Sequence, residues 1–201
     1  MRLFRKYFSR YGHAILLACA LTLGAMHPAS AQDLEDQTTQ LLHALDALSA
    51  RADMTVETRA DAFLALAESR FEFDTIAAAS LPRNQSLSPA TQADYLAAFR
   101  THLSLSYGET VRRFGPSTSR FVGLRQRQDR PTIAFVDTTS GTTTRRSSWG
   151  LCPTPNLRIC SIDVDGVRLS RQLRADFTKI VARDGIAAFL EALRSGALVQ
   201  R

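Results

Sequence analysis

The sequence predicts an α+β fold in which helices come first, a meander of short strands follows, and helices close the chain. Two observations carry this prediction. Between residues 33 and 114, and again between 173 and 193, apolar side chains recur every three or four residues, as in amphipathic helices. Between residues 121 and 164 the pattern changes to short β-branched and aromatic segments. Segregated helices and strands form a curved antiparallel or mixed sheet with helices on one face.

The first 31 residues have the features of a secretory signal peptide. Residues 2–10 carry four basic side chains, residues 14–26 are apolar, and Ala29-Ser30-Ala31 is a small-x-small cleavage site. The apolar run is shorter than the roughly 20 residues that span a bilayer, although an uncleaved anchor is the alternative. We expect cleavage after Ala31, location in the periplasm, and a single domain over residues 32–201.

Removal of this segment changes the charge balance. The full chain has 25 basic and 19 acidic residues, a net charge of +6. Residues 1–31 contain four basic residues and no acidic ones, which leaves a net charge of +2 for the remainder. A nearly balanced charge gives little support to nucleic-acid binding, so no nucleic-acid partner is expected.

Four helices are expected in the first half of the domain, over residues 33–51, 56–69, 74–82 and 88–114. The last has the clearest bounds, because a serine and a proline suit its first positions and Gly115-Pro116 ends it. Its apolar stripe is unusually aromatic and consists of Tyr95, Phe99, Leu103, Tyr107, Val111 and Phe114.

Strands are expected over residues 121–127, 132–138 and 158–164, with a shorter one over 145–149. Apolar residues on both sides of an Asp165-Gly166 turn then lead into the C-terminal helices. Gly185 interrupts the helical period and Gly196 ends it.

Two cysteines remain after the signal segment, Cys152 and Cys160. An oxidising compartment favours a disulfide between them. The sequence of the ring, C-P-T-P-N-L-R-I-C, has neither the C-x-x-C spacing of a redox pair nor a nearby histidine for a metal. We therefore predict a structural disulfide and no metal site.

Catalytic motifs are missing from the sequence. After the signal segment the histidines are His43 and His102, and both fall in helical patterns. The carboxylates of Asp74, Asp163 and Asp165 have no base or nucleophile at a diagnostic spacing, and caps or turns explain them equally well. The sequence predicts no enzyme, no catalytic residue and no cofactor.

Three blocks of the chain resemble the MlaC family, periplasmic phospholipid-binding proteins that are also called toluene-tolerance auxiliary components of ABC transporters. The first is Phe71-Glu72-Phe73-Asp74 with the short helix after it. The second is Leu87-Ser88-Pro89 with Gln92, Tyr95, Phe99 and Tyr107, and the third is Asp165-Gly166-Val167 with Arg174, Asp176, Phe177, Gly185, Leu190 and Leu193. Their order and spacing agree from about residue 33 to residue 196.

The chain also departs from this family pattern. Pro82 follows Leu81 where the family has glycine, and Gln85-Ser86 stand where it has Trp-Arg. Leu157 and Ser161 replace a W-x-x-x-D pattern, and the two-cysteine loop is not usual. The chain therefore resembles a divergent member, and a hopanoid or another lipid is an alternative ligand.

The resemblance implies an apolar pocket between a twisted sheet and helices, which holds the acyl chains of a phospholipid. It also implies partners: an inner-membrane MCE-domain protein of an ABC transporter and an outer-membrane lipoprotein complex, between which the carrier moves lipid. The pocket walls are predicted to be Phe73, Tyr95, Phe99, Leu103, Tyr107, Phe135, Val164 and Phe177. By composition alone these residues form an ordinary core. A non-catalytic adaptor with a filled core is thus the alternative, and cavity volume distinguishes the two.

Overall fold

The computed structural model describes residues 30–83, 85–128, 130–154 and 156–199. The elements are α1 (Ala31–Ser49), α2 (Val56–Ala67), α3 (Phe73–Ser80), α4 (Pro89–Phe114), β1 (Ser117–Arg127), β2 (Arg130–Ser140), β3 (Thr143–Leu151), β4 (Ile159–Val164), β5 (Val167–Arg168) and α5 (Leu169–Arg194). The predicted α+β class and the order of its parts are confirmed. The predicted signal segment lies outside the described residues except for its last two. Within the described part, no helix is long and apolar enough to span a bilayer.

Side-chain caps begin three of the helices, as the sequence pattern indicates for α4. Ser30, Thr55 and Ser88 accept hydrogen bonds from backbone amides at the starts of α1, α2 and α4. Ser30 also forms a reciprocal capping box with Asp33. The predicted cleavage after Ala31 would remove Ser30, and the processed chain would then begin α1 without this cap.

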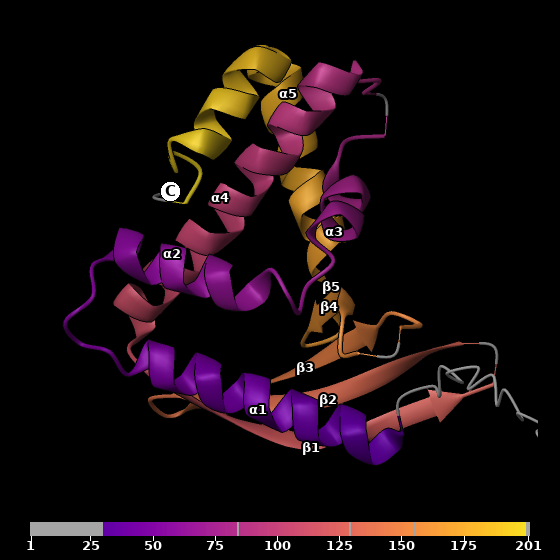
Figure 1. Cartoon of the computed structure of the whole chain (residues 1–201). Helices are drawn as coiled ribbons and strands as arrows, with labels where there is room; N and C mark the ends of the chain where they lie inside the picture. The colour runs from indigo at the N-terminus through magenta and orange to yellow at the C-terminus, as the bar shows by residue number, and fades with distance from the viewer. Residues whose placement is uncertain (1–29, 84, 129, 155, 200–201) are drawn as a thin grey trace, which may run out of the picture.

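The five strands form one antiparallel meander in the order β1-β2-β3-β4-β5. The predicted short strand over 145–149 is a full strand, and β1 begins four residues before its predicted start. Ala134, Val136 and Trp149 are buried on the inner face of the sheet. Helix α1 lies along that face and contacts β1, while α2, α4 and α5 form a second layer above it (Figure 1).

The sheet is tied to the connection between α2 and α3 by an isolated parallel bridge between Phe71 and Ile159. The Ile159 amide donates to the Arg70 carbonyl at 2.8 Å, and the Glu72 amide donates to the Ile159 carbonyl at 2.9 Å. The first residue of β4 therefore fixes the segment that runs directly into α3.

The two predicted C-terminal helices are joined end to end as α5. Gly185 breaks the helical geometry inside it, with φ of 79° and ψ of 169°. A side chain at this φ would be strained, because the left-handed region favours glycine. The sequence-based position of the interruption is confirmed.

Close packing of α2 on α4 depends on Gly108. A Cβ atom at this position would lie 2.5 Å from the backbone oxygen of Val56, the first residue of α2. We expect Gly108→Ala to lower the free energy of unfolding by about 1–3 kcal/mol, because a backbone atom must move. Urea unfolding would measure this change. At a helical glycine with open space around it, the same substitution stabilises the helix by up to about 1 kcal/mol. A stabilised Gly108→Ala protein would therefore contradict the packing argument.

Candidate functional site

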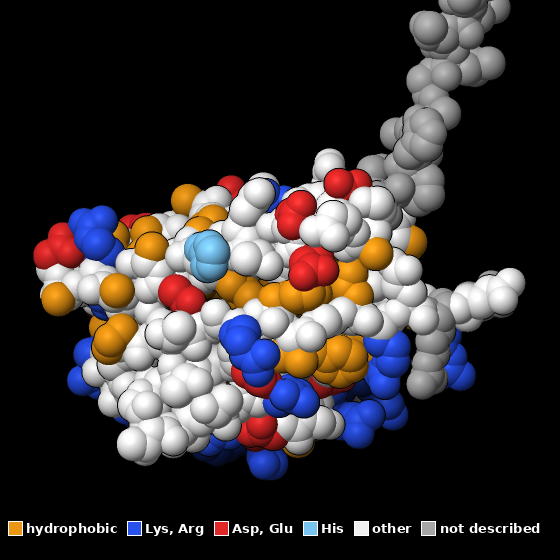
Figure 2. Space-filling view, turned by 90° about the horizontal axis from the view of Figure 1, so that it is seen from below, with side chains coloured by type: hydrophobic (Ala, Val, Ile, Leu, Met, Phe, Trp, Pro, Cys, Tyr) orange, Lys and Arg blue, Asp and Glu red, His pale blue; other side chains and the backbone are white. Residues whose placement is uncertain are grey.

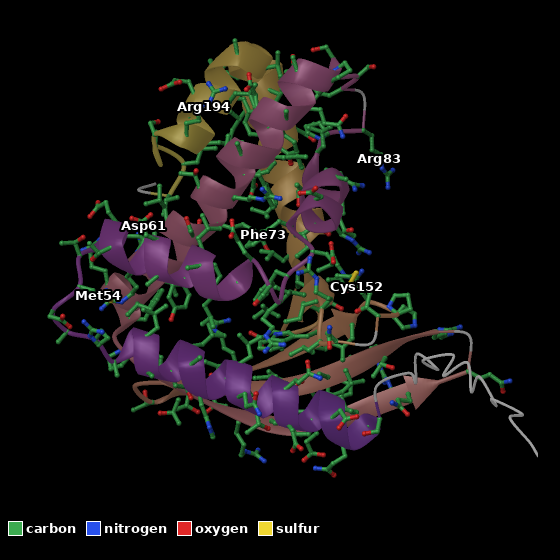
Figure 3. All side chains as sticks on the ribbon, viewed as in Figure 1. Met54, Asp61, Phe73, Arg83, Cys152 and Arg194 are labelled. Atoms are coloured by element: carbon green, nitrogen blue, oxygen red, sulfur yellow. A yellow bond between two sulfur atoms is a disulfide. The ribbon has the colours of Figure 1, made fainter. Side chains whose placement is uncertain are left out.

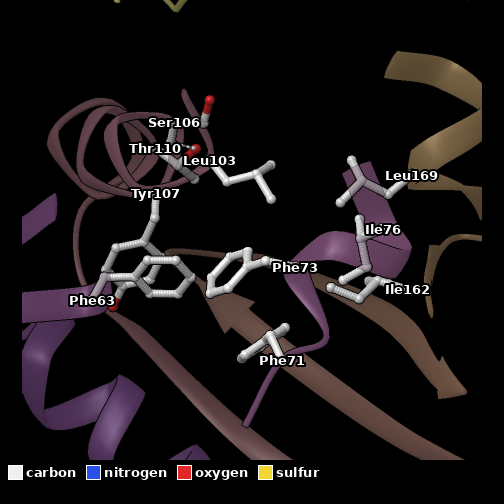
Figure 4. Close-up of a pocket in the computed structure, with 10 residues that line it drawn as sticks. All are labelled: Phe63, Phe71, Phe73, Ile76, Leu103, Ser106, Tyr107, Thr110, Ile162 and Leu169. Atoms are coloured by element: carbon white, nitrogen blue, oxygen red, sulfur yellow. Dashed lines mark hydrogen bonds between the residues drawn. The ribbon is translucent and has the colours of Figure 1, made fainter. Parts of the chain in front are cut away.

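An apolar cavity of about 240 Å³ lies between α2, α3, α4, β4 and the start of α5 (Figure 4). It is lined by Phe63, Phe71, Phe73, Ile76, Leu103, Ser106, Tyr107, Thr110, Ile162 and Leu169. No lining residue is an acid, a base or a histidine. The cavity therefore presents aromatic and aliphatic surface on all of its walls.

The three hydroxyl groups in the lining already bond backbone carbonyls. Ser106 Oγ donates to His102 O at 2.7 Å, and Thr110 Oγ1 donates to Ser106 O at 2.7 Å. The Tyr107 hydroxyl donates to Leu45 O at 3.0 Å. Because these donors are engaged, the cavity has little free polar capacity with which to orient a polar substrate or catalyse a reaction.

Aromatic rings form a continuous wall from α4 to the sheet. Phe63 stacks on Tyr107 with ring centroids 4.4 Å apart. The centroid of the Phe63 ring also lies 6.2 Å from that of Phe71. Phe71 in turn contacts Phe73 at 6.0 Å and Trp149 at 6.4 Å. Offset and tilted ring pairs at these distances are attractive, and the wall consists of rigid, bulky groups.

The F-E-F-D segment places two phenylalanines in the cavity wall at the start of α3. Phe71 carries the bridge to Ile159, Phe73 is the first residue of α3, and both line the cavity, whereas Glu72 does not. Arg158 donates to the Glu72 carboxylate at 2.6 Å and to the Glu68 carbonyl at 2.9 Å. Figure 3 shows Phe73 directed into the interior between the sheet and the helices.

Three of the residues predicted as pocket walls, Phe73, Leu103 and Tyr107, line this cavity. Three others lie in a second aromatic cluster between α4 and α5. The Phe99 and Phe177 rings are 6.4 Å apart, and Phe177 packs on Phe189 at 4.9 Å. Tyr95 joins this cluster, donates its hydroxyl to Ala77 O at 2.9 Å, and has its pKa raised by burial.

Phe135 and Val164 lie elsewhere. Phe135 is on the face of β2 opposite the buried Ala134 and Val136, under the Arg125 guanidinium at 5.1 Å. Figure 2, which views the molecule from the side of α1 and the sheet, shows basic side chains beside apolar ones there. Val164, at the end of β4, has 36% of its surface exposed. The structure does not bring these two residues to the described cavity.

The sequence prediction missed several lining residues, namely Phe63, Phe71, Ile76, Ser106, Thr110, Ile162 and Leu169. Phe71 could have been predicted as a lining residue, because it is paired with Phe73 in the F-x-F motif of the sequence. For α4 the error has a geometric cause. Steps of four residues advance about 40° around a helix, so a stripe that begins at Tyr95 has turned by about 120° at Tyr107. Its first half faces α5 and its second half faces the cavity.

His102 is buried beside the second aromatic cluster. Only 6% of its surface is exposed, its ring lies 5.8 Å from that of Phe177, and its Nδ1 has no hydrogen-bond partner among the described residues. Desolvation lowers the pKa of His102 from 6.5 to about 4. The fold therefore holds this side chain in its neutral form.

This burial predicts a dependence of stability on pH. His102 binds a proton near pH 6.5 in the unfolded chain but only near pH 4 in the folded chain. The folded state therefore has its full stability above pH 6.5 and loses stability as the pH falls toward 4. Between pH 7.5 and 5 we expect a loss of about 2 kcal/mol that His102→Met does not show. Urea unfolding at both pH values measures the difference, and identical pH profiles would rule the prediction out.

The predicted disulfide is present between Cys152 and Cys160, whose Cα atoms are 5.4 Å apart. Inside the ring, Leu157 is fully buried, and its amide donates to Gln37 Oε1 of α1 at 3.0 Å. Ile159, also fully buried, is the first residue of β4 and carries the bridge to Phe71. The ring thus supports the wall that contains Phe71 and Phe73.

The fold and the cavity together define a class: an α+β fold in which helices and an antiparallel sheet surround an uncharged, aromatic pocket. Residues 35–195 match the model of the MlaC protein family, and the chain belongs to that family. No curated protein matches the sequence significantly. Among the described residues, no group of three or more His, Cys, Asp or Glu side chains could hold a metal ion.

A similar solved structure is that of the phospholipid-binding protein from Ralstonia solanacearum, determined in complex with a phospholipid. The two structures superpose with a TM-score of 0.64 at 14% sequence identity, over 84% of this chain and 99% of the other. This likeness shows that the two chains share a fold.

Proposed function

We propose that this protein is a periplasmic carrier that holds the acyl chains of a phospholipid in its apolar cavity. The observation that carries the proposal is the lining itself: aromatic and aliphatic walls whose few hydroxyls are engaged with backbone carbonyls. Membership of the MlaC family and the phospholipid-bound structural relative support it. No catalytic group or cofactor enters this function.

The volume of the cavity determines what binding requires. About 240 Å³ is below the roughly 300–1,000 Å³ that is usual for small-molecule pockets, so a whole lipid requires the walls to move apart. Each buried CH₂ group contributes about 0.8 kcal/mol, and two acyl chains supply ample energy for that opening. The same energy opposes release, so a partner must stabilise the open form.

We propose that such partners are an inner-membrane MCE-domain protein of an ABC transporter and an outer-membrane lipoprotein complex. The carrier would move lipid between them across the periplasm. A single small domain with its own pocket suits this task, because the ligand remains shielded from water during transfer.

Native mass spectrometry of protein purified from its own periplasm tests the proposal. We expect an added mass that disappears on solvent extraction and is recovered as phospholipid in the extract. A hopanoid in the extract would keep the carrier function and change the ligand. Protein without lipid that also takes up none from phospholipid vesicles would refute the carrier function and favour an adaptor.

A further inference from the structure

A second hollow, separate in its lining from the apolar cavity, lies between the end of α3 and the first half of α5. Its volume is about 1,100 Å³. Helices α3 and α5 line both spaces with different residues. Ile76 and Leu169 line the apolar cavity, whereas Ala79 and Ser170 line this second hollow. We call it the basic groove, and it is lined by Ala79, Pro82, Arg83, Gln85, Arg168, Ser170, Arg171, Arg174, Ala175, Thr178, Lys179, Val181 and Ala182.

The basic groove has five cationic side chains and no carboxylate in its lining. Two of the five are paired with acids outside the lining: Arg168 with Asp163, and Lys179 with Asp176 at 3.5 Å. Arg83 and Arg171 are exposed and form no ion pair among the described residues. Most described arginines do form one. Arg83, Arg171 and Arg174 thus bring three arginines without an ion pair among the described residues to one groove.

Arg174 holds the two walls of the groove together. Its Nη2 donates to the carbonyl of Ala79 in the last turn of α3, where helix carbonyls carry partial negative charge. Its Nε is shielded from solvent and has no hydrogen-bond partner among the described residues. The Arg174 guanidinium is therefore fixed in the wall with a donor still unused.

The shape of the groove indicates what it binds. Arg168 caps the start of α5, Arg171 and Arg174 follow it at intervals of three on the helix, and the lining continues to Ala182. At 1.5 Å per residue this lining is about 20 Å long, much longer than one phosphate or carboxylate. Figure 3 shows Arg83 extending outward from the segment after α3, at the rim of this region. Several anionic groups on one extended or helical segment would fit such a row.

The groove also favours a protein over a lipid surface. Its apolar lining consists of alanines, Pro82 and Val181, without an aromatic or leucine side chain that could insert into a bilayer. Arginine is enriched at protein interfaces and binds carboxylates in a bidentate manner. We propose that the basic groove docks an acidic segment of a partner protein. This inference goes beyond lipid carriage, because the groove and the cavity have different linings.

Fluorescence anisotropy with a labelled poly-glutamate peptide tests the proposal, and the variant is Arg83→Gln with Arg171→Gln. The matched control is Arg51→Gln with Arg112→Gln, which removes the same charge from exposed, ion-paired sites elsewhere. We expect the groove variant to weaken peptide binding about tenfold or more and the control variant to leave it nearly unchanged. Rising salt should weaken binding to the unmodified protein.

Three outcomes of the peptide and vesicle experiments would overturn the proposal. They are equal weakening in both variants, no peptide binding by the unmodified protein, and binding to phosphatidylglycerol vesicles that displaces the peptide and is lost only in the groove variant. Lipid content is measured in parallel. Lipid loss confined to the groove variant would assign the groove to a headgroup and also overturn docking. Lipid absent from every protein would refute the carrier function and leave the peptide result valid.

Discussion

A tryptophan at position 103 is expected to reduce the lipid content of the purified protein about tenfold or more. Leu103 is half-buried on α4 and lines the cavity together with Phe73 and Ile76. Leu103→Trp places an indole ring in a space of about 240 Å³, and the volume that it fills is no longer open to an acyl chain. Native mass spectrometry gives the ratio of lipid-bound to lipid-free protein directly.

The matched control is Ala97→Trp. Ala97 is on the same helix but is exposed, so the same ring there remains in solvent. Overpacking in the Leu103 variant can cost about 1–3 kcal/mol, so thermal unfolding of both variants accompanies the lipid measurement. A folded Leu103→Trp protein that retains as much lipid as the Ala97→Trp protein would show that the ligand lies elsewhere.

Removing the disulfide is expected to lower stability and loosen one wall of the cavity. A ring closed between Cys152 and Cys160 contributes about 2–3 kcal/mol by restricting the unfolded chain. The ring also holds Ile159 against Arg70 and Glu72, next to the two phenylalanines of the cavity. We expect Cys152→Ser with Cys160→Ser to shift the urea midpoint accordingly and to speed hydrogen exchange at the Glu72 and Ile159 amides.

The control is the unmodified protein after reduction, whose urea midpoint and hydrogen exchange should match those of the double-serine variant. A reducing agent should not change the double-serine variant itself. Faster exchange throughout the protein with unchanged relative protection at Glu72 would mean that the disulfide contributes only global stability. It would remove the local role assigned to the ring.

Local chemistry made several features predictable. Ser88 and Gly115-Pro116 bound α4 because capping and chain-breaking preferences act within a few residues. Gly185 breaks α5 because its φ of 79° suits glycine. The disulfide followed from the pairing of two cysteines in a chain predicted to be exported. Each of these predictions depended on residues close together in the sequence.

The lining of the cavity was only partly predictable. Periodicity showed that Tyr95, Phe99, Leu103 and Tyr107 are apolar and on one helix, but not which neighbour each of them faces. Phe135 looked like a core residue, yet it packs on the outer face of the sheet under Arg125. A strand shows which residues share a face and does not show which face is covered.

The sequence by itself determined the α+β class, the helix bounds, the disulfide and the resemblance to a family of lipid carriers. It did so because caps, periods and motifs are local or depend on order along the chain. Only the tertiary structure decided that α4 divides its stripe between α5 and a cavity, and that Arg83 lines a groove with Arg171. These arrangements depend on how helices far apart in sequence pack and rotate against each other, and no local pattern encodes that geometry.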